Sequence, residues 1–409
     1  MKKLIVLLFI LIQAGMLNEV SACTTFIISG KYTPDGRPIL YKHRDTGTLD
    51  NALIYFTDGK YPYIGLVDAT ADGTSTVWGG YNSTGFAIMN SAAYNNNIGD
   101  TTTLVDREGI VMKLALQQCA TLADFEKMLT ELPKPLGVDA NFGVIDASGG
   151  AAYYETGQQG FKKIDANDPA VAPFGYLIRT NHSFTGVTDK GFGYIRYATA
   201  AGVLNMATAT NSIEPQYLIN NISRNLTHSL TKVNLREGIP ANNSQPDFRY
   251  FEDFIPRNIT AAVIMVVGVK EGEDAANTMM WTVLGFPLVT VAVPVWITSG
   301  EDLPRILSMK ADFHAPLCDG AMKLKSQCFP VTRGSGGKYI NLAAVINAEK
   351  TGIMQLIEPV ENEIFIKTRD LLSHMPEGKN RSAVIREHYK WLDSYITESY
   401  KRLFGTDIM

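Results

Sequence analysis

The sequence predicts a layered α+β fold, in which strand pairs alternate with helical segments in one large domain. Runs rich in β-branched and aromatic residues recur and are bounded by turn signals such as Pro34-Asp35-Gly36. Stretches with helical spacing of apolar residues lie between these runs. No internal repeat and no low-complexity linker divides the chain, so we expect its layers to share one core.

The first half of the chain supplies most of the strand signals. Residues 23–29 (Cys-Thr-Thr-Phe-Ile-Ile-Ser) and 37–45 predict two strands, and 86–89 predict a short buried strand that ends at Asn90. Helical periodicity holds over 107–132, with a break at 120–121 and an end before Pro133. The stretch 141–155 predicts a hairpin through its Ser-Gly-Gly turn.

The second half alternates in the same way. We expect a strand from residue 176 that ends in a polar cluster at Asn181, then helices over 191–206 and 211–226. The segments 251–269 and 279–294 are strand-like because Val, Ile, Thr and Trp are enriched in them. The tail over about 355–409 is charged and helical in pattern, and we expect it to be an extension of the domain.

The N-terminus has the three parts of a secretory signal peptide. Met1-Lys-Lys is followed by the apolar run 4–12 and by a segment that ends in small residues at Ala22. The apolar run is too short to span a membrane, which takes about 20 residues. We therefore expect cleavage before Cys23, a mature domain over 23–409, and export to the periplasm or the extracellular space.

Composition narrows the classes of partner. The chain has 409 residues, 45% of them hydrophobic and 19% charged, with a net charge of −4. No basic face stands out, so we expect no nucleic-acid partner. No later run of apolar residues is long enough to predict a membrane span. We allow for a homo-oligomer.

Cys23 is the leading candidate for chemistry. Cleavage before it would place a thiol and a free α-amine on one residue, and the amine can serve as the base for the thiolate near neutral pH. Two other interpretations remain open. A lipoprotein signal would acylate the cysteine, although the polar Asn18 and Glu19 separate it from the apolar run. A structural disulfide is the other.

The remaining cysteines have more ordinary expectations. Cys119 falls on a helical pattern and is expected to be a buried apolar residue. Cys318 and Cys328 lie ten apart in a segment with turn residues, where a local disulfide is plausible in an exported protein. No C-x-x-C motif and no pair of histidines at ligand spacing occurs, so the sequence predicts no metal site and no cofactor.

The first two strands are expected to form a hairpin beside Cys23. A turn over 33–36 would pair positions whose numbers sum to 69, which places Asp45 opposite Thr24 and Thr46 opposite Cys23. The segment 42–45 (Lys-His-Arg-Asp) would then return beside the new N-terminus. A slip or bulge would change the face on which each side chain lies, so this register leaves the faces open.

Taken in order, these motifs resemble the choloylglycine hydrolase family of N-terminal-nucleophile hydrolases. The family includes bile salt hydrolases and penicillin V acylases, and is related to acyl-CoA:6-aminopenicillanic acid acyltransferases and cysteine-nucleophile dipeptidases. The resemblance runs from Cys23 to about Pro294 through Asn-x-x-Gly-Phe-Ala-x-x-Asn at 82–90, Thr-Asn-His at 180–182 and an Arg-Tyr pair. It implies a four-layer αββα sandwich with antiparallel sheets.

The resemblance also implies roles for individual residues. Cys23 would attack an amide carbonyl, Asp45 would hold its amine or thiol, and Asn90 and Asn181 would lie near the oxyanion and the amine. Arg-Tyr occurs twice, and for the family's late arginine we rank Arg249, which follows an Ile-Pro loop, above Arg196. In the family, an Arg-Asn pair precedes the position of Asp45 by a few residues, and the corresponding residues here are Lys and His. The cation near the thiol would therefore be either Lys42 or Arg44, which would share one face of a strand.

The sequence thus predicts an exported cysteine amidohydrolase that cleaves a linear amide C–N bond through a thioester on Cys23. Bile salts, N-acyl amino acids or lactones, and penicillin-type amides all suit that chemistry. An acyltransferase or a dipeptidase on the same scaffold is the first alternative, since both use the same intermediate. A non-catalytic lipoprotein with an acylated Cys23 is the second.

Overall fold

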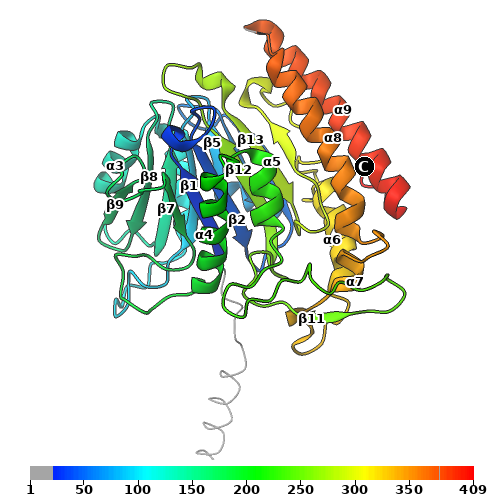
Figure 1. The fold of residues 1–409 in the computed structure, drawn as a ribbon. Coiled ribbons are helices and arrows are strands. Elements are labelled where there is room, and N and C mark those ends of the chain that lie inside the picture. Colours follow the sequence, from blue (N-terminus) through cyan, green and yellow to red (C-terminus); the bar gives the residue numbers. More distant parts are fainter. Residues whose placement is uncertain (1–21, 377) are drawn as a thin grey trace, which may run out of the picture.

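The protein is described by a computed structural model that covers residues 22–376 and 378–409. Two large sheets, with six and seven strands, pack against each other and are covered on their outer faces by helices (Figure 1). Every strand pairing in both sheets is antiparallel. The predicted α+β class with an αββα layering is confirmed.

The six-stranded sheet begins with the chain and returns to it from distant segments. Its spatial order is β10-β1-β2-β12-β13-β14. The bounds, in chain order, are β1 (Cys23–Ile28), β2 (Ile39–Asp45), β10 (Tyr176–Arg179), β12 (Thr260–Val267), β13 (Met279–Leu284) and β14 (Val293–Val295). Strand β1 thus lies between β2 and β10, and its six residues are all buried.

The seven-stranded sheet is a meander in which consecutive strands are neighbours. Its bounds are β3 (Asn51–Phe56), β4 (Tyr63–Asp68), β5 (Gly79–Asn82), β6 (Ala87–Ala92), β7 (Ala140–Ile145), β8 (Ala151–Thr156) and β9 (Phe161–Asp165). Strands β6 and β7 pack on β1 and β2 of the other sheet. A separate two-stranded sheet joins β11 (Phe248–Tyr250) to β15 (Tyr339–Asn341).

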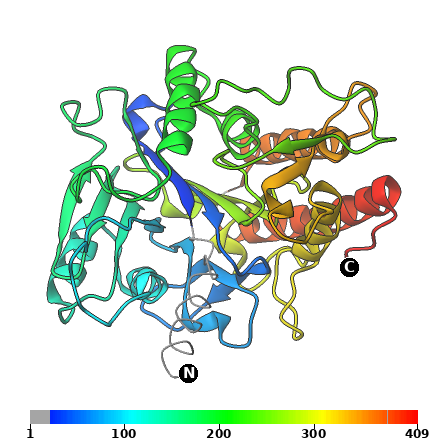
Figure 2. The ribbon, with the colours of Figure 1, turned by 90° about the horizontal axis from the view of Figure 1, so that it is seen from below.

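The helices form the outer layers. Helices α2 (Glu108–Gln118) and α3 (Leu122–Glu131) lie on the seven-stranded sheet, and α4 (Tyr194–Ala209) lies on β1 and β10. The others are α5 (Pro215–Leu218), α6 (Pro316–Cys328), α7 (Leu342–Val345), α8 (Ile353–Ser373) and α9 (Lys379–Phe404). The long helices α8 and α9 run side by side at the C-terminal end of the chain (Figures 1 and 2). Among the described residues, no helix is long and apolar enough to cross a membrane.

Several local signals operate as the sequence indicated. The break predicted at 120–121 separates α2 from α3, because Thr121 and Asp124 form a reciprocal capping box that starts the second helix. Strands β7 and β8 form the predicted hairpin.

The segment expected to be one helix over 211–226 is instead the short α5 followed by a π-helical turn at Ile219–Ser223. Cys119 is buried at the C-terminal end of α2, as predicted.

The predicted Cys318–Cys328 disulfide is wrong. Both residues lie in α6, and all four cysteines are free thiols. A rise of about 1.5 Å per residue separates positions ten apart in a helix by about 15 Å, whereas a disulfide needs Cα atoms within about 7 Å. Pro316 misled the sequence interpretation: we took it as a loop residue, but it occupies the first turn of the helix, where proline is tolerated.

The predicted hairpin register is also wrong, by two positions. Cys23 pairs with Arg44 and Ile28 with Ile39, so paired numbers sum to 67. A 3-10 turn over Gly30–Tyr32 lengthens the connection, and the hydroxyl of Thr33 bonds the carbonyls of Gly30 and Arg37 within it. A shift of two keeps the alternation of faces, which places Cys23 on the same face as Arg44 and Lys42.

Candidate active site

Cys23 is the first residue of β1, and its side chain lies on the face of the sheet that packs against the second sheet. The residue is only 8% exposed. It lines a cavity of about 500 Å³, together with residues of β2, β6 and the segments that flank α2. The predicted candidates Lys42, Arg44, Asp45 and Asn90 line the same cavity. The fold therefore brings residues from three candidate positions, 42, 44 and 90, to the cavity of the cysteine, and the chain at Asp45 also borders it.

The main chain of Cys23 is held by two side chains, of Asn181 and Arg196, that do not line this cavity. Residue 22 is still joined to Cys23 here, so the Cys23 nitrogen is a peptide N–H, and it donates to Asn181 Oδ1 at 3.0 Å. The Asn181 amide group donates in turn to the Ala92 carbonyl at 2.9 Å. Both ends of this carboxamide are engaged, so its oxygen is oriented toward the nitrogen that cleavage would convert into an amine.

Arg196, on α4, completes that clamp. Its Nη1 donates to the Cys23 carbonyl (2.7 Å) and to Thr24 Oγ1 (2.9 Å), and its Nη2 donates to Asn181 Oδ1 (2.7 Å). The side chain is fully buried, and burial lowers the guanidinium pKa to about 10, which still leaves it charged at neutral pH.

Arg249, the first choice for the late arginine, is not brought to the site. It lies on β11 with its side chain 43% exposed and forms an ion pair with Asp247, at 2.9 Å for the Nη2 bond. It does not line the cavity of Cys23. Both arginines precede a tyrosine, and the Ile-Pro loop before Arg249, on which the ranking rested, did not mark the residue that reaches the site. Arg196, the second choice, is the one that contacts the cysteine.

Lys42 and Asn90 form a bonded pair next to the thiol. The Lys42 ammonium donates to Asn90 Oδ1 at 2.6 Å and to the Trp78 carbonyl at 2.7 Å. An ammonium has only donors, so it fixes the carboxamide oxygen toward itself and makes the NH₂ end of Asn90 the donor at the other side. Burial lowers the Lys42 pKa to about 8, and the charge of Cys23 opposes that shift.

Arg44 shares the face of Lys42, as the sequence indicated, but is differently engaged. Its Nη1 bonds Asn51 Oδ1 and forms an ion pair with Asp68 at 2.8 Å. Its guanidinium also lies over the Trp78 ring, 4.8 Å from the centroid. Of the two early cations, Lys42 bonds a candidate site residue, whereas Arg44 is committed to Asp68.

Asp45 does not contact the Cys23 nitrogen, contrary to expectation. The alternation of β2 places its side chain on the other face of the sheet, where it accepts from Thr260 Oγ1 (2.7 Å) and Arg257 Nε (3.0 Å). His43, on the same face, bonds Thr260 through Nε2 at 3.1 Å, and burial lowers its pKa to about 4, so it is neutral. Asp45 therefore holds Thr260 and Arg257 in place on the face of the sheet away from the cavity.

Sequence reasoning missed Arg257 and the acidic wall of the cavity. Arg257 lies in the loop before β12, and no motif marks it. Glu108, at the first position of α2, and Asp139, just before β7, line the cavity of Cys23, together with Asp106. They look like solvated loop and helix-end residues in the sequence, and only the packing of α2 against β6 brings them to the thiol.

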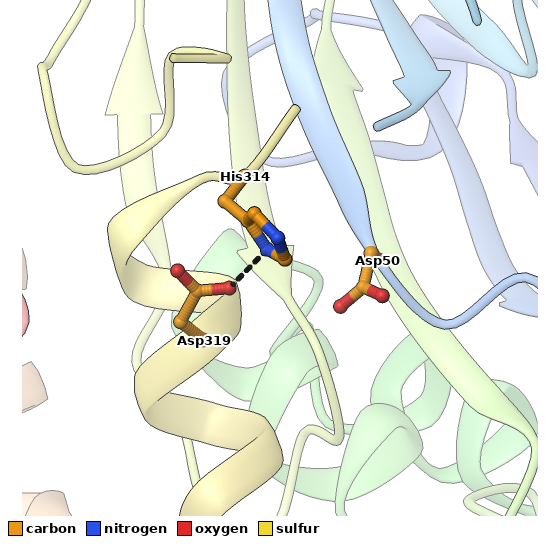
Figure 3. A group of neighbouring side chains, drawn as sticks. All are labelled: Asp50, His314 and Asp319. Carbon is orange, nitrogen blue, oxygen red and sulfur yellow. Dashed lines mark hydrogen bonds and ion pairs between the residues drawn. The ribbon is translucent and has the colours of Figure 1, made fainter. Parts of the chain in front are cut away.

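A group of possible metal ligands lies elsewhere in the molecule. Asp50 comes from one segment, and His314 and Asp319 come from the start of α6 and the residues just before it. One ligand atom from each of the three lies within 4.8 Å of the others (Figure 3). His314 Nδ1 is hydrogen-bonded to Asp319 Oδ1 at 3.1 Å, and both side chains are exposed. That bond accounts for the arrangement without an ion, and none of the three residues lines the cavity of Cys23.

The sequence matches a known family over the part of the chain that carries most of these residues. A family model described as acyl-coenzyme A:6-aminopenicillanic acid acyl-transferase matches residues 34–235. The matched stretch includes Lys42, Asp45, Asn90, Asn181 and Arg196, and it ends before Arg249. This match confirms the resemblance to the acyltransferases. No curated protein matches the sequence.

Solved structures of acylases and amidases are among those similar to the chain. Penicillin V acylase from Agrobacterium tumefaciens is 14% identical, with 68% of this chain and 86% of that one covered and a TM-score of 0.40. A mutant of conjugated bile acid hydrolase from Clostridium perfringens is 11% identical, with 67% and 92% covered and a TM-score of 0.41. The Caenorhabditis elegans ortholog of N-acylethanolamine-hydrolyzing acid amidase is 14% identical, with 60% and 92% covered and a TM-score of 0.40.

Proposed function

We propose that the protein is an exported cysteine amidohydrolase, which becomes active when cleavage before Cys23 frees its α-amine. The observation that carries the proposal is that the main chain of Cys23 is fixed by hydrogen bonds while the residue also borders a cavity. Its main-chain N–H is held by Asn181 and its carbonyl by Arg196, and the residue borders a cavity that a buried lysine also lines. A nucleophile needs both an oriented base and an accessible, electropositive surrounding.

In the proposed reaction, the freed amine of Cys23 takes the thiol proton, and the sulfur attacks the substrate carbonyl. The positive charge of Lys42 favours the thiolate. The NH₂ end of Asn90 is the donor for the oxyanion, a contribution typically worth about 100- to 1000-fold in rate. The amine then returns the proton to the leaving nitrogen, which breaks the C–N bond and leaves a thioester. Water, deprotonated by the same amine, hydrolyses the thioester and regenerates the thiol.

The substrate class is a linear amide. Bile salts, N-acyl amino acids or lactones, and penicillin-type acyl amides all place an acyl group on the sulfur and release an amine. Acyl transfer to an amine acceptor is the alternative that the matched family favours, because the description of that family names an acyltransferase. It differs only in the group that attacks the thioester, and a dipeptidase differs only in the substrate.

The first experiment is an intact-mass measurement on the protein secreted from the full-length gene. We expect the mass of residues 23–409 with an unmodified amine. Rapid-quench mass spectrometry with a panel of acyl 4-nitroanilides should then detect an acyl adduct on the fragment that contains Cys23. Adding an amine such as hydroxylamine separates the two fates, since a transferase gives mainly the acylated amine and a hydrolase gives mainly the acid.

The lipoprotein alternative predicts a different mass. Diacylation of Cys23 would add two acyl chains and a glycerol to the protein. The structure offers little room for these groups, because Cys23 is 8% exposed and β1 begins at the cysteine itself. A lipid-modified Cys23, or a mature chain that begins elsewhere, would end the amidohydrolase proposal.

A further inference from the structure

Exposed apolar side chains gather at the end of the molecule where β1 begins. Four segments form what we call the end face: 184–194, 229–237, 247–250 and 331–339. Together they hold 33 residues, yet they carry ten of the 21 large apolar side chains that are exposed in the described part of the chain. Single exposed apolar residues are ordinary, whereas such a concentration marks an interaction site.

The strand order places the first of these segments beside the start of β1. Strand β10 runs antiparallel to β1, and its last residue, Arg179, pairs with Thr25, so the loop that follows lies at the end where β1 begins. Phe192, from that loop, and Tyr194, the first residue of α4, are exposed and line a cavity of about 700 Å³ together with Lys338. Two segments that are distant in the sequence thus border one cavity.

The small sheet of β11 and β15 continues the end face. Tyr339 directly follows Lys338 and is paired with Tyr250, and the two exposed rings lie 5.7 Å apart in an edge-to-face contact. Strand β11 lies at the lower end of the molecule in Figure 1, where α4 also begins. The tyrosine pair therefore extends the surface that Phe192 and Tyr194 start.

A tight hairpin before β11 presents the most exposed of these side chains, Leu230. The main-chain N–H of His228 donates to the Val233 carbonyl at 2.8 Å, which closes the hairpin. Ser229 Oγ donates to the Ile195 carbonyl at 2.7 Å, which ties the hairpin to the first turn of α4. The loop is thus held in place by hydrogen bonds, and yet it leaves the leucine 70% exposed.

The end face is positively charged, although the chain as a whole is negative. Its segments contain six Lys and Arg residues and three Asp and Glu residues, while the chain has a net charge of −4. One of the three acids, Asp247, is paired with Arg249 at 2.9 Å. The other two are Asp189 and Glu237. The charge of this face is therefore complementary to that of an anionic partner.

The mixture of residue types favours a lipid surface over a protein partner. Lys232 lies two positions from Leu230, and Lys338 lies beside Tyr339, and all four side chains are exposed. The buried centre of a protein–protein interface is depleted in lysine. Surfaces that bind at the membrane interface combine apolar and aromatic residues with Lys and Arg, because the apolar groups enter the headgroup region while the cations meet anionic lipids.

We propose that the end face docks on the surface of an anionic lipid bilayer. Leu230 and Tyr250 are apolar anchors, and Lys232 and Lys338 lie at the level of the lipid phosphates. Ala22 also borders the cavity of this face, so docking brings the start of β1 close to the lipid surface. The proposal concerns binding and does not rest on the proposed reaction.

The test measures binding of the secreted protein to lipid vesicles by co-sedimentation. One set of vesicles contains phosphatidylcholine alone, and in the other phosphatidylglycerol replaces about a third of it. We expect the partition coefficient to be higher for the mixed vesicles by about tenfold or more. It should fall when the NaCl concentration rises from about 0.1 M to about 1 M, because salt screens the attraction.

Two pairs of variants separate the end face from the rest of the surface. Leu230→Ser and Tyr250→Ser each remove an anchor and should lower binding to the mixed vesicles by about tenfold. Met206→Ser and Phe174→Ser are the matched controls, because Met206 is 57% exposed and Phe174, like Tyr250, is 55% exposed. Met206 lies about 18 Å along α4 from its start, and Phe174 precedes β10 at the other end of that strand. Both controls should bind as the wild type does.

Reversal of charge tests the cations of the end face. Lys232→Glu and Lys338→Glu should each lower binding to the mixed vesicles by about fivefold or more. Lys367→Glu changes an exposed lysine on α8 and should leave binding unchanged. Far-UV circular dichroism shows whether each variant is folded.

Failure of the wild type to bind the mixed vesicles overturns the proposal, and so does equal binding by the end-face variants and the wild type. Size-exclusion chromatography tests the other partner that an apolar surface could have, a second copy of this chain. A dimer that Leu230→Ser dissociates, without binding to vesicles, would overturn membrane docking and assign the face to self-association.

Discussion

Two cavities at opposite ends of the same strands differ in what they offer a ligand. The cavity of Cys23 is about 500 Å³ and adjoins the last residues of β2, Lys42 to Asp45. The other is about 770 Å³, adjoins Ile39 at the start of β2, and is lined by the aromatic rings of Trp281, Trp296 and Phe365. About 20 Å of strand separates the two ends.

The larger cavity has a partly aromatic lining, and two of its arginines form ion pairs. Arg37 pairs with Glu273, and Arg381 pairs with Asp274 at 3.9 Å. The smaller cavity contains a buried cation beside a thiol, and carboxylates to which the described residues supply no cationic partner. We therefore place the proposed chemistry in the smaller cavity, because a reactive group with charged residues around it marks a functional site better than size and apolarity do.

The largest expected effect comes from the cysteine of the smaller cavity. Cys23→Ala removes the nucleophile, and we expect amide cleavage to fall by at least about 10⁴-fold, as when a covalent nucleophile is removed from other hydrolases. Initial rates with the best 4-nitroanilide measure the loss. Cys328→Ala, a buried cysteine in α6, is the matched control and should retain cleavage. Turnover by the Cys23 variant would reject the mechanism.

The next effect compares two arginines that precede a tyrosine. Arg196→Lys keeps the charge but cannot bond Cys23, Thr24 and Asn181 at once, so we expect kcat to fall by about 10²-fold or more with a smaller change in KM. A shifted pH profile is the second readout, because a displaced amine changes its pKa. Arg249→Lys should stay within about twofold of wild type. Equal losses in both variants would contradict the positioning role of Arg196.

A smaller effect tests the cation of the active cavity. The Lys42 ammonium, with its pKa lowered to about 8, is charged below that pH and supports the thiolate only there. We therefore expect kcat/KM to decline as the pH rises above about 8, by about tenfold per unit once the ammonium is mostly neutral. Lys42→Arg keeps a charged guanidinium throughout this range and should lack the decline. If kcat/KM of the Lys42→Arg variant still declined at alkaline pH, Lys42 would not be the group that supports the thiolate.

The smallest effect comes from the aromatic cavity. Trp281 is buried, and its indole N–H has no hydrogen-bond partner in the described part of the chain. Trp281→Phe removes this unsatisfied donor and some packing area, and the two changes should offset each other to within about 1 kcal/mol of the free energy of unfolding. Urea denaturation measures it. Cleavage rates should stay within about twofold, and a large loss of activity would mean that the two ends of the sheet are coupled.

Much of the local structure could be predicted from the sequence. The capping box at Thr121 and Asp124 marks the break between α2 and α3, and the Ser-Gly-Gly turn marks the β7–β8 hairpin. The polar clusters at Asn90 and Asn181 were recognised because each ends a short apolar run. These signals are local, so a few neighbouring residues are sufficient to specify them.

Long-range placement could not be predicted in the same way. Arg196 and Arg249 have the same local pattern, and only the packing of α4 on β1 buries one of them against Cys23. The register of the first hairpin depends on a turn whose length the sequence left ambiguous, and the observed register differs from the expected one by two positions. Glu108 and Asp139 reach the cavity because two sheets and a helix meet there.

The sequence by itself determined the layered fold class, the choice of Cys23 as the candidate nucleophile, and the presence of a basic segment that pairs with it. These depend on residue type and on spacing along the chain. The tertiary structure decided which cation and which carboxylates line the cavity of Cys23, and which arginine bonds its main chain. That choice depends on burial and on distances between segments more than 100 residues apart, such as the 2.7 Å bond from Arg196 to the Cys23 carbonyl. Electrostatic interactions are strong only where water is excluded, and the packing of the layers determines where that occurs.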